Sequence, residues 1–504
     1  MFTCPRNELP YNPDDPVSIE AHGRRLEGRT VIDIARELDY RQILESQDGG
    51  KGKVGNLVEA WFRLAPNSRP ESDFPCGVEI KVAPLKPHKT STYTSKERMV
   101  VGVIPFNDIV REEWETAHAR QKLERILVVT YKHDFTNAGQ AGFLISFLWS
   151  PPAIDTPQLR TDWTRTRDTV RMGHAHLLSE SIGRYLGPST KGTGTRNNPA
   201  ADLVQQPFSP ILAKRRAFAL KARYIVVQVR KRLAPEQFVR LADPRTRIET
   251  IESSILSKLH SYTGMSVQAL CDQLEIPVLG TDKSLAARLL NAALGIEEGK
   301  SIEELETAGV QVKTVHARKP DSKSRGKYLQ PFEAMSFPAI EFEDLLDEEW
   351  GPNVGILDEL QRLLVIPTFS DNRKTPQADR ILGPAFFWSP TANQEHIIEE
   401  DWTELIDQVQ NGAAAEFQVY NPDRTPRMRK TSKRIIPWVE NHLPGERDGR
   451  ILHLRPHTGD ADDKVPVPGG QITRQSFWLN RSFVRELLVA SFSDQPDQSG
   501  LTLQ

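Results

Sequence analysis

Cysteine is scarce in this chain of 504 residues, and the three that occur, Cys4, Cys76 and Cys271, are widely scattered. They form neither a CxxC zinc pattern nor a disulfide framework, so we expect a reducing, cytosolic compartment. No apolar run approaches the length of a transmembrane helix, and residues 1–16 lack the basic-then-apolar order of a signal peptide. We therefore expect a cytoplasmic protein without a membrane partner.

A large net charge is also missing, because 65 Lys and Arg nearly balance 67 Asp and Glu to give -2. Without a global basic excess, any surface that binds nucleic acid has to be local. The hydrophobic fraction of 38% is that of an ordinary globular protein. The length exceeds what one hydrophobic core usually serves, which favours two domains.

Helical and strand patterns alternate in the first half of the chain, which predicts an α/β or α+β domain with a mixed central sheet flanked by helices. Residues 187–198 read as a polar, cationic loop, and residues 216–230 as an apolar and basic segment. The predicted helices cover residues 31–44, 54–64, 112–124 and 158–170, and the predicted strands cover 77–82, 99–104, 126–131 and 143–148.

The pattern then restarts after a seam near Leu233. The segment FLWSPPAIDTPQLRTDW at 147–163 matches FFWSPTANQEHIIEEDW at 386–402, with a WSP tripeptide and a DW pair at the same separation. LERIL at 123–127 matches LQRLL at 360–364, and RAFALK at 216–221 matches QSFWLN at 475–480. Several anchors in one order predict two tandem copies, which we place at 1–233 and 234–504.

The first copy contains an ordered set of acids and one lysine that suits metal-assisted hydrolysis of a phosphodiester. Asp73 precedes a predicted strand, and Glu79 and Lys81 share one face of that strand because side chains alternate. Carboxylates that hold Mg²⁺ with open positions can neutralise a phosphate and activate water. Glu59, on the preceding helix, is either a further ligand or a partner of Lys81. Taken alone, D-x5-E-x-K is weak, since such a pattern is more often a solvated polar face.

The surrounding motifs are more specific. KGKVGNLVEAWF at 51–62, SRPESDFP at 68–75 and GVEIKVAPLK at 77–86 are followed by TAHARQKLERIL at 116–127, FLWSP and the DW pair. This series resembles the MutH mismatch-repair endonuclease and the Sau-type GATC-specific type II restriction endonucleases. The resemblance implies two restriction-endonuclease-like (MutH-like) domains and Mg²⁺-dependent cleavage of DNA. The length and the duplication favour the restriction enzymes.

Carried over by position, the resemblance assigns the catalytic site to Glu59, Asp73, Glu79, Lys81 and Lys122, with the three acids as metal ligands. The interval from Asp73 to Glu79 is one residue shorter than in the mismatch-repair protein, which leaves the path of that turn open. The further assignments concern DNA: base readout by Lys191, with a phosphate contact as its alternative, and phosphate contacts by Arg216 and Lys221.

The second copy lacks the acids. Gln311 stands where the first copy has Glu79, Asn291 is opposite Glu59, and Glu359 aligns with Lys122. Leu305 occupies the offset of Asp73, although Glu304 or Glu306 could approach that place. We therefore expect no catalytic metal here. Residues for DNA binding remain, and they are assigned to Arg455, His457 and Trp478.

These assignments predict a type II restriction endonuclease that acts on double-stranded DNA containing GATC and that needs a cognate DNA methyltransferase in the same cell. One active centre per chain implies a DNA-induced dimer for a double-strand break. The second copy is then an allosteric sensor of another site, or else a structural remnant. Two other functions stay open: a mismatch-repair-type GATC nickase and a DNA-binding regulator that does not cut.

Overall fold

The computed structural model consists of two compact units. The first contains Met1–Ile251, Gly299–Gly309 and Gly351–Asn353, and the second contains Glu252–Glu298, Val310–Trp350 and Val354–Gln504. The sequence-based boundary at 233/234 stays a prediction. The structure describes residues 2–40, 52–65, 71–87, 93–95, 98–132, 140–191, 199–241, 246–277, 284–318, 329–348, 350, 355–430, 434–446, 449–457, 460 and 462–493.

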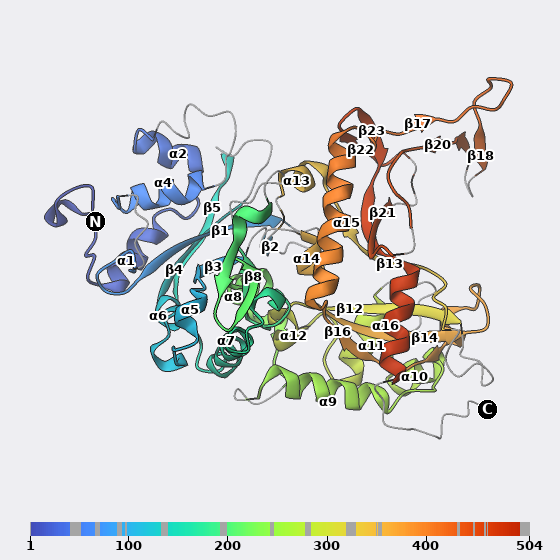
Figure 1. The fold of residues 1–504 in the computed structure, drawn as a ribbon, viewed down its shortest axis with the longest axis horizontal. Helices are drawn as coiled ribbons and strands as arrows, with labels where there is room; N and C mark the ends of the chain where they lie inside the picture. Colours follow the sequence, from blue (N-terminus) through green and yellow to red (C-terminus); the bar gives the residue numbers. More distant parts are fainter. Residues whose placement is uncertain are drawn as a thin grey trace. The chain divides into compact units, whose positions relative to one another are not determined.

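A four-stranded mixed sheet forms the centre of the first unit, in the order β2-β1-β4-β5 (Figure 1). The two inner strands run parallel, and each outer strand is antiparallel to its neighbour. At the start of β1, apolar side chains alternate with polar ones, because successive side chains of a strand point to opposite faces of the sheet. The strands are β1 (Glu79–Pro87), β2 (Tyr93–Ser95), β4 (Ile126–Lys132) and β5 (Phe143–Trp149).

Three helices near the amino terminus build a hydrophobic core together with this sheet. Ile19, Ile34 and Leu57, one from each helix, are fully buried. The helices are α1 (Pro16–Arg24), capped by Asp15, α2 (Val31–Glu37), which begins with a capping box at Thr30, and α4 (Lys53–Trp61). The core therefore fixes the helix that carries Glu59 against the strand that carries Glu79.

A second, antiparallel sheet in the first unit has the order β3-β9-β6. Its strands are β3 (Met99–Val103), β6 (Leu186–Thr190) and β9 (Arg216–Leu220), and β7 (Leu203–Gln206) and β8 (Ser209–Lys214) form a separate hairpin. The helices of this part are α5 (Phe106–Ile109), α6 (His118–Leu123), α7 (Thr156–Arg171) and α8 (Ala222–Leu233).

The second unit repeats this plan around its own core. Strand β12 pairs in parallel with β14, and β14 pairs with β16 antiparallel, as β4 does with β5. The sheet β13-β24-β21 corresponds to β3-β9-β6. Its elements are α11 (Leu285–Ala293), β12 (Val310–Arg318), β13 (Met335–Ala339), α13 (Phe342–Asp347), α14 (Gly355–Leu360), β14 (Arg362–Ser370), β15 (Ile381–Leu382), β16 (Phe386–Trp388), α15 (Ala392–Gln410), β21 (Leu452–Pro456), β22 (Lys464–Val467), β23 (Gly470–Thr473), β24 (Gln475–Leu479) and α16 (Arg481–Ser493).

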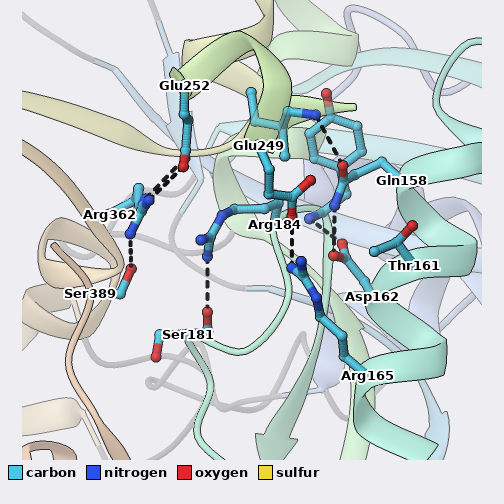
Figure 2. A network of polar contacts seen from close by, with 12 residues as sticks. Gln158, Thr161, Asp162, Arg165, Ser181, Arg184, Glu249, Glu252, Arg362 and Ser389 are labelled. Atoms are coloured by element: carbon cyan, nitrogen blue, oxygen red, sulfur yellow. Dashed lines mark hydrogen bonds and ion pairs between the residues drawn. The ribbon is translucent and has the colours of Figure 1, made fainter. Parts of the chain in front are cut away.

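Residues 238–307 add short elements, some in each unit. These are β10 (Phe238–Val239), which pairs with β11 (Ser301–Ile302), and the helices α9 (Ile248–His260), α10 (Val267–Gln273) and α12 (Glu303–Thr307). Figure 2 shows the ion pairs at the start of α9: Glu249 meets Arg165 of the first unit, and Glu252 meets Arg362 of the second. None of the helices in the described ranges is long and apolar enough to cross a membrane.

Three predicted elements differ from the structure. The helix expected from residue 31 to 44 already ends at Glu37, and Asp39 has a positive φ of 48°. The helix expected over residues 112–124 is interrupted at Ala117, whose backbone is extended, and it consists of a short 3-10 turn at Trp114–Thr116 followed by α6. The loop expected from Gly187 begins only after Thr190, because Gly187 to Thr190 pair with β9. The remainder of that loop, 192–198, lies outside the described residues, as do residues 41–44 of the first predicted helix.

Candidate active site

Strand β1 presents Glu79 and Lys81 together at one face of the central sheet. The parallel register places Glu79 beside Ile126 and Lys81 beside Val128. Ile80, between them, points into the hydrophobic core. The alternation expected from the sequence is therefore present, and burial of the apolar face leaves the two charged side chains on the other.

Lys122 lies against the same carboxylate. Its Nζ is 3.2 Å from Oε1 and 3.3 Å from Oε2 of Glu79, while the Nζ of Lys81 is 2.9 Å from Oε1. The Glu79 side chain is only 7% exposed, so both pairs are screened weakly by solvent. Helix α6 ends at Leu123, just before β4 begins at Ile126. Because β4 pairs with β1, Lys122 lies beside Glu79 at the start of β1.

Asp73 approaches the same place from a tight turn. The turn closes with the N–H of Gly77 donating to the carbonyl of Phe74, and Gly77 has a positive φ of 80° that suits glycine. Asp73 Oδ2 accepts a hydrogen bond of 2.8 Å from the N–H of Ile80. Burial raises the pKa of the Asp73 carboxyl, and the nearby charge of Glu79 raises it further. The path of this turn thus brings the two acids within electrostatic range.

Glu59 completes the group from α4, whose buried Leu57 and Val58 pack into the core. Burial raises the pKa of the Glu59 carboxyl first, and the charge of Asp73 adds to this effect. Lys81 opposes the shift, and Glu79 reinforces it. Glu59 and Asp73 therefore each sense neighbouring carboxylates, and the cluster of three acids is receptive to a cation.

The donor set fits a hard divalent cation with a partly open coordination shell. No three His, Cys, Asp or Glu side chains in the described ranges converge closely enough to hold a metal on their own. Mg²⁺ usually takes only one or two carboxylates and fills its other positions with water and substrate phosphate, so a complete protein cage is not required. A cation would also stabilise the ionised forms of Glu59 and Asp73, whose pKa values are raised first by burial and then by neighbouring carboxylates.

The equivalent strand of the second copy has kept its register but lost this chemistry. Gln311 lies beside Leu363, as Glu79 lies beside Ile126, so the two positions correspond. Lys313, the counterpart of Lys81, donates to the carbonyl of Ser336 at 3.0 Å and lies 4.3 Å from the centre of the Phe337 ring. A neutral amide is a poor ligand for Mg²⁺, and the lysine here serves a structural contact.

The other acids near this strand have different partners. Glu304 accepts the N–H of Leu241 at 3.0 Å, and Glu306 is 3.4 Å from Arg230. Both contacts belong to the first unit. Leu305, at the offset of Asp73, is buried, and Asn291 lies on α11. Nothing in this set of residues replaces the three acids of the first copy.

The predicted DNA-binding residues of the first copy separate into two environments. Lys191 is exposed at the end of β6, and its backbone N–H donates to the carbonyl of Arg215. Arg216 and Lys221, by contrast, are 7% and 2% exposed. Both side chains are therefore buried in the structure.

The burial of Arg216 and Lys221 is explained by the contacts around Glu180. It is buried, forms an ion pair with Arg98, and accepts hydrogen bonds from Ser189 Oγ and Thr190 N. Lys221 Nζ donates to the backbone carbonyl of Glu180. Arg216 donates to the carbonyls of Leu178 and Pro188 and to Thr190 Oγ1. The two cations therefore support strand β6, which leads to Lys191, and their contact with phosphate stays a prediction.

In the second copy the predicted residues lie together on β21 and β24. Arg455 is exposed, and its guanidinium carbon is 4.9 Å from the centre of the Trp478 ring. His457 lies 6.3 Å from the same ring and shares a 3.0 Å hydrogen bond with Ser476 Oγ. The strand registers pair Pro456 with Gln475 as they pair Thr190 with Arg216, so His457 occupies the position of Lys191.

The sequence analysis used the DW pairs as markers of the repeat and of the family resemblance, and it missed their structural role. Asp162 is fully buried on α7, where Figure 2 shows it beside Gln158, and it accepts the N–H groups of Tyr185 and Leu186 at 2.7 and 3.0 Å. Asp401 on α15 accepts those of Ile451 and Leu452 at 2.6 and 2.9 Å. Each aspartate therefore fixes the first residue of the strand that carries a predicted DNA-reading position.

The tryptophans that follow these aspartates pack alike in both copies. Trp163 lies 5.9 Å from Trp114 at an interplanar angle of 55°, and Trp402 lies 5.5 Å from Trp350 at 52°. Both rings of the DW pairs are buried. The recurring DW spacing was the sequence feature that could have indicated a shared structural role. The hydrogen bonds of the aspartates and the ring contacts of the tryptophans show what that role is.

Comparisons with known proteins agree with this duplication. A family model described as the DNA mismatch repair enzyme MutH matches the chain twice, at residues 62–162 and 294–401. The type II restriction enzyme Sau3AI of Staphylococcus aureus is 28% identical over 503 residues, which cover 91% of this chain and 97% of that enzyme. The DNA mismatch repair protein MutH of Salmonella paratyphi A is 29% identical over 223 residues, 44% of this chain and 92% of that protein. The predicted tandem α+β organisation is confirmed.

Proposed function

This chain belongs to the MutH-like endonuclease family and is a site-specific deoxyribonuclease, and on that premise we propose that it is a type II restriction endonuclease that cuts duplex DNA at GATC with Mg²⁺. The observation that carries the proposal is the convergence of Asp73, Glu79, Lys81 and Lys122 in the first copy, whereas Gln311 and Glu359 stand at the positions of Glu79 and Lys122 in the second. Similarity to a restriction enzyme along nearly the whole chain supports restriction over repair.

In the proposed site, Asp73 and Glu79 would hold the cation, and Glu59 on α4 would add a third negative charge beside it, as a further ligand or as a partner of Lys81. Mg²⁺, when bound, supplies charge neutralisation at the phosphate and lowers the pKa of a coordinated water. Lys81 projects from the same face as Glu79 and orients the attacking water or stabilises the developing negative charge. Lys122 keeps the Glu79 carboxylate in place through its two contacts of 3.2 and 3.3 Å.

The second copy, in this proposal, binds another GATC duplex without cutting it and thereby favours the cutting-competent state of the chain. Support comes from the exposed Arg455 beside Trp478 and from the loss of the acids at Gln311 and Asn291. One active centre per chain cuts one strand, so a DNA-induced dimer would complete a double-strand break. A matching methyltransferase would protect the host DNA.

The test is digestion of unmethylated DNA with Mg²⁺, with the ends mapped and the wild type compared with Asp73→Asn. Asparagine retains an oxygen for the N–H of Ile80 but loses the charge, so the turn should persist while cleavage falls by at least about 10²-fold. Cleavage at the wild-type rate would contradict the assignment. Product that stops at nicked plasmid under saturating enzyme would favour the mismatch-repair-type nickase instead.

The sensor role has its own test. Arg455→Ala with His457→Ala should reduce the stimulation of cleavage by added GATC duplex, while the rate on a one-site substrate without added duplex is unchanged. An undiminished response to the added duplex would favour the structural remnant.

A further inference from the structure

The second copy contains an insertion that the first copy lacks. In the first copy, residues 172–185 connect α7 to β6; in the second, residues 411–451 connect α15 to β21. Both connections end at the same anchor, because Asp162 accepts the N–H of Leu186 and Asp401 accepts the N–H of Leu452. The extra residues are therefore additional to a shared framework.

Among the described inserted residues, 417–430 and 434–440 form a β-ribbon, which we call the arm. Strand β17 (Phe417–Gln418) pairs with β20 (Val439–Glu440), and β18 (Met428–Lys430) pairs with β19 (Ile435–Pro437). Figure 1 shows β17, β18 and β20 extending away from the rest of the second unit. Few of the described arm residues are buried, so the arm contributes little to the hydrophobic core.

A single side chain organises the base of the arm. Gln418 Nε2 donates to the carbonyls of Val419, Arg427 and Trp438 at 2.7, 3.1 and 3.2 Å. The N–H of Arg427 donates to Val419, and that of Trp438 donates to Arg427. These hydrogen bonds join the strands where the two halves of the ribbon meet. The arm is therefore an ordered structure even though most of its described residues are exposed.

The arm is strongly cationic in a chain that is almost neutral. Residues 423–434, DRTPRMRKTSKR, contain six Lys and Arg and one acid, Asp423. The carboxylate of Asp423 already accepts hydrogen bonds within the arm: its Oδ1 accepts one from the N–H and one from the hydroxyl of Thr425. In the part of the arm that the structure describes, no acidic side chain forms an ion pair with the exposed Arg424, Arg427, Arg429 or Lys430.

Arg427 is also held in place before any partner arrives. Its guanidinium carbon lies 4.2 Å from the centre of the Trp438 ring. A planar, weakly hydrated guanidinium on an aromatic ring is well suited to phosphate, and its fixed position reduces the entropy lost on binding. A two-stranded ribbon is narrow enough to enter the major groove of B-DNA or to follow its backbone.

We propose that the arm binds the phosphate backbone of duplex DNA next to the sequence held by β21 and β24 of the second copy. This inference rests on the proposed DNA binding by that copy and extends it with a second, sequence-independent surface. The cations act through charge, so the arm should raise affinity for cognate and unrelated DNA alike. In the first copy, the described connection of residues 172–185 between α7 and β6 contains no such ribbon.

The test uses the full chain with Glu79→Gln, which prevents cleavage during binding measurements. The arm variant carries three substitutions that spare the Arg427–Trp438 contact: Arg424→Gln, Arg429→Gln and Lys430→Gln. A matched control removes three exposed cations elsewhere in the second unit: Lys258→Gln, Arg373→Gln and Lys374→Gln. Fluorescence anisotropy measures the affinity for a long GATC duplex as a function of salt, and a thermal melt checks that all variants are folded.

Loss of three phosphate contacts should lower the slope of log affinity against log salt by about 2–3 and weaken binding at low salt by about tenfold or more. The control should change neither value. An arm variant that matches the control in affinity and slope overturns the proposal. So does a variant that binds DNA normally but changes the oligomeric state in light scattering, since that result assigns the arm to protein contacts.

A parallel measurement with Arg455→Ala and His457→Ala separates this proposal from the one on which it rests. If these substitutions weaken binding and the arm variant does not, the arm proposal alone fails. If neither set has an effect, DNA binding by the second copy fails as well, and the arm proposal fails with it.

Discussion

Lys122 forms an ion pair with Glu79 across 43 residues of sequence, at 3.2 Å between Nζ and Oε1. The pair joins the end of α6 to the first residue of β1. In the second copy the same two positions hold Glu359 and Gln311, so the attraction is absent there. The site of the first copy is therefore a network, in which removal of one member should affect the others.

Lys122→Ala should slow single-turnover cleavage by about 10²-fold, because it leaves the Glu79 carboxylate with one lysine and a less defined orientation. The affinity for cognate DNA should change little. Lys132→Ala, at the exposed end of β4, is the control for loss of a nearby cation. An unchanged single-turnover rate for Lys122→Ala would remove this lysine from the catalytic site.

Glu59→Gln should stabilise the protein at pH 7 in the absence of divalent cations. The pKa of Glu59 is raised in the folded state by burial and by Asp73, so its ionisation costs stability. The stability associated with the protonated form is present below the ordinary pKa and is lost as the pH rises through the raised value. We expect an increase in Tm of about 1–2 °C at pH 7 and almost none near pH 4.

The same substitution, Glu59→Gln, also tests cation binding without an assay of cleavage activity. Mg²⁺ should raise the Tm of the wild type more than that of Glu59→Gln, because binding to the folded state alone is stabilising. Glu71→Gln, at an exposed position, should behave as the wild type in both experiments. A decrease in Tm at pH 7 for Glu59→Gln would contradict the electrostatic account of the site.

Asp162→Ala should destabilise the start of β6 by about 3 kcal/mol, because two buried N–H groups, those of Tyr185 and Leu186, lose their acceptor. Hydrogen exchange measured by mass spectrometry should show faster exchange at these amides, and this local measurement is needed because a chain of two units need not unfold in one step. Asp168→Ala, half-exposed on the same helix, is the control. Equal exchange in both variants would disprove the anchoring role.

Phe208→Gly should stabilise the first unit by about 1 kcal/mol. Phe208 has a φ of 64° at the turn between β7 and β8 and is 73% exposed, so its ring gains little from burial. The second copy has Gly469, with a φ of 85°, at the same place in the turn between β22 and β23. A left-handed conformation costs a residue with a Cβ about 1–2 kcal/mol. The measurement is the Tm, and a decrease would mean that the ring makes contacts that outweigh the strain.

Much of the central sheet was predictable from the sequence, because its strands have clear apolar runs and its charged residues alternate with buried ones. The proximity of Lys122 to Glu79 was implied by resemblance and could not have come from spacing, since it depends on the parallel pairing of β1 with β4. The aligned register of Gln311 with Leu363 gives a structural reason for treating the second copy as a decayed version of the first.

The surface assignments were harder to predict. The burial of Arg216 and Lys221 depends on Glu180, which is distant in sequence and gives no periodic signal. The roles of Asp162 and Asp401 depend on N–H groups at the start of another strand. Such tertiary hydrogen bonds decide where a charged residue lies, and neither propensity nor pattern contains them.

The most direct test of a single cutting centre is cleavage of unmethylated GATC plasmid by two reciprocal variants, Glu79→Gln and Gln311→Glu, with DNA binding measured in parallel. The account predicts that Glu79→Gln binds the site but leaves both strands intact, while Gln311→Glu cuts at the wild-type rate. Cleavage of either strand by Glu79→Gln at the wild-type rate would contradict it.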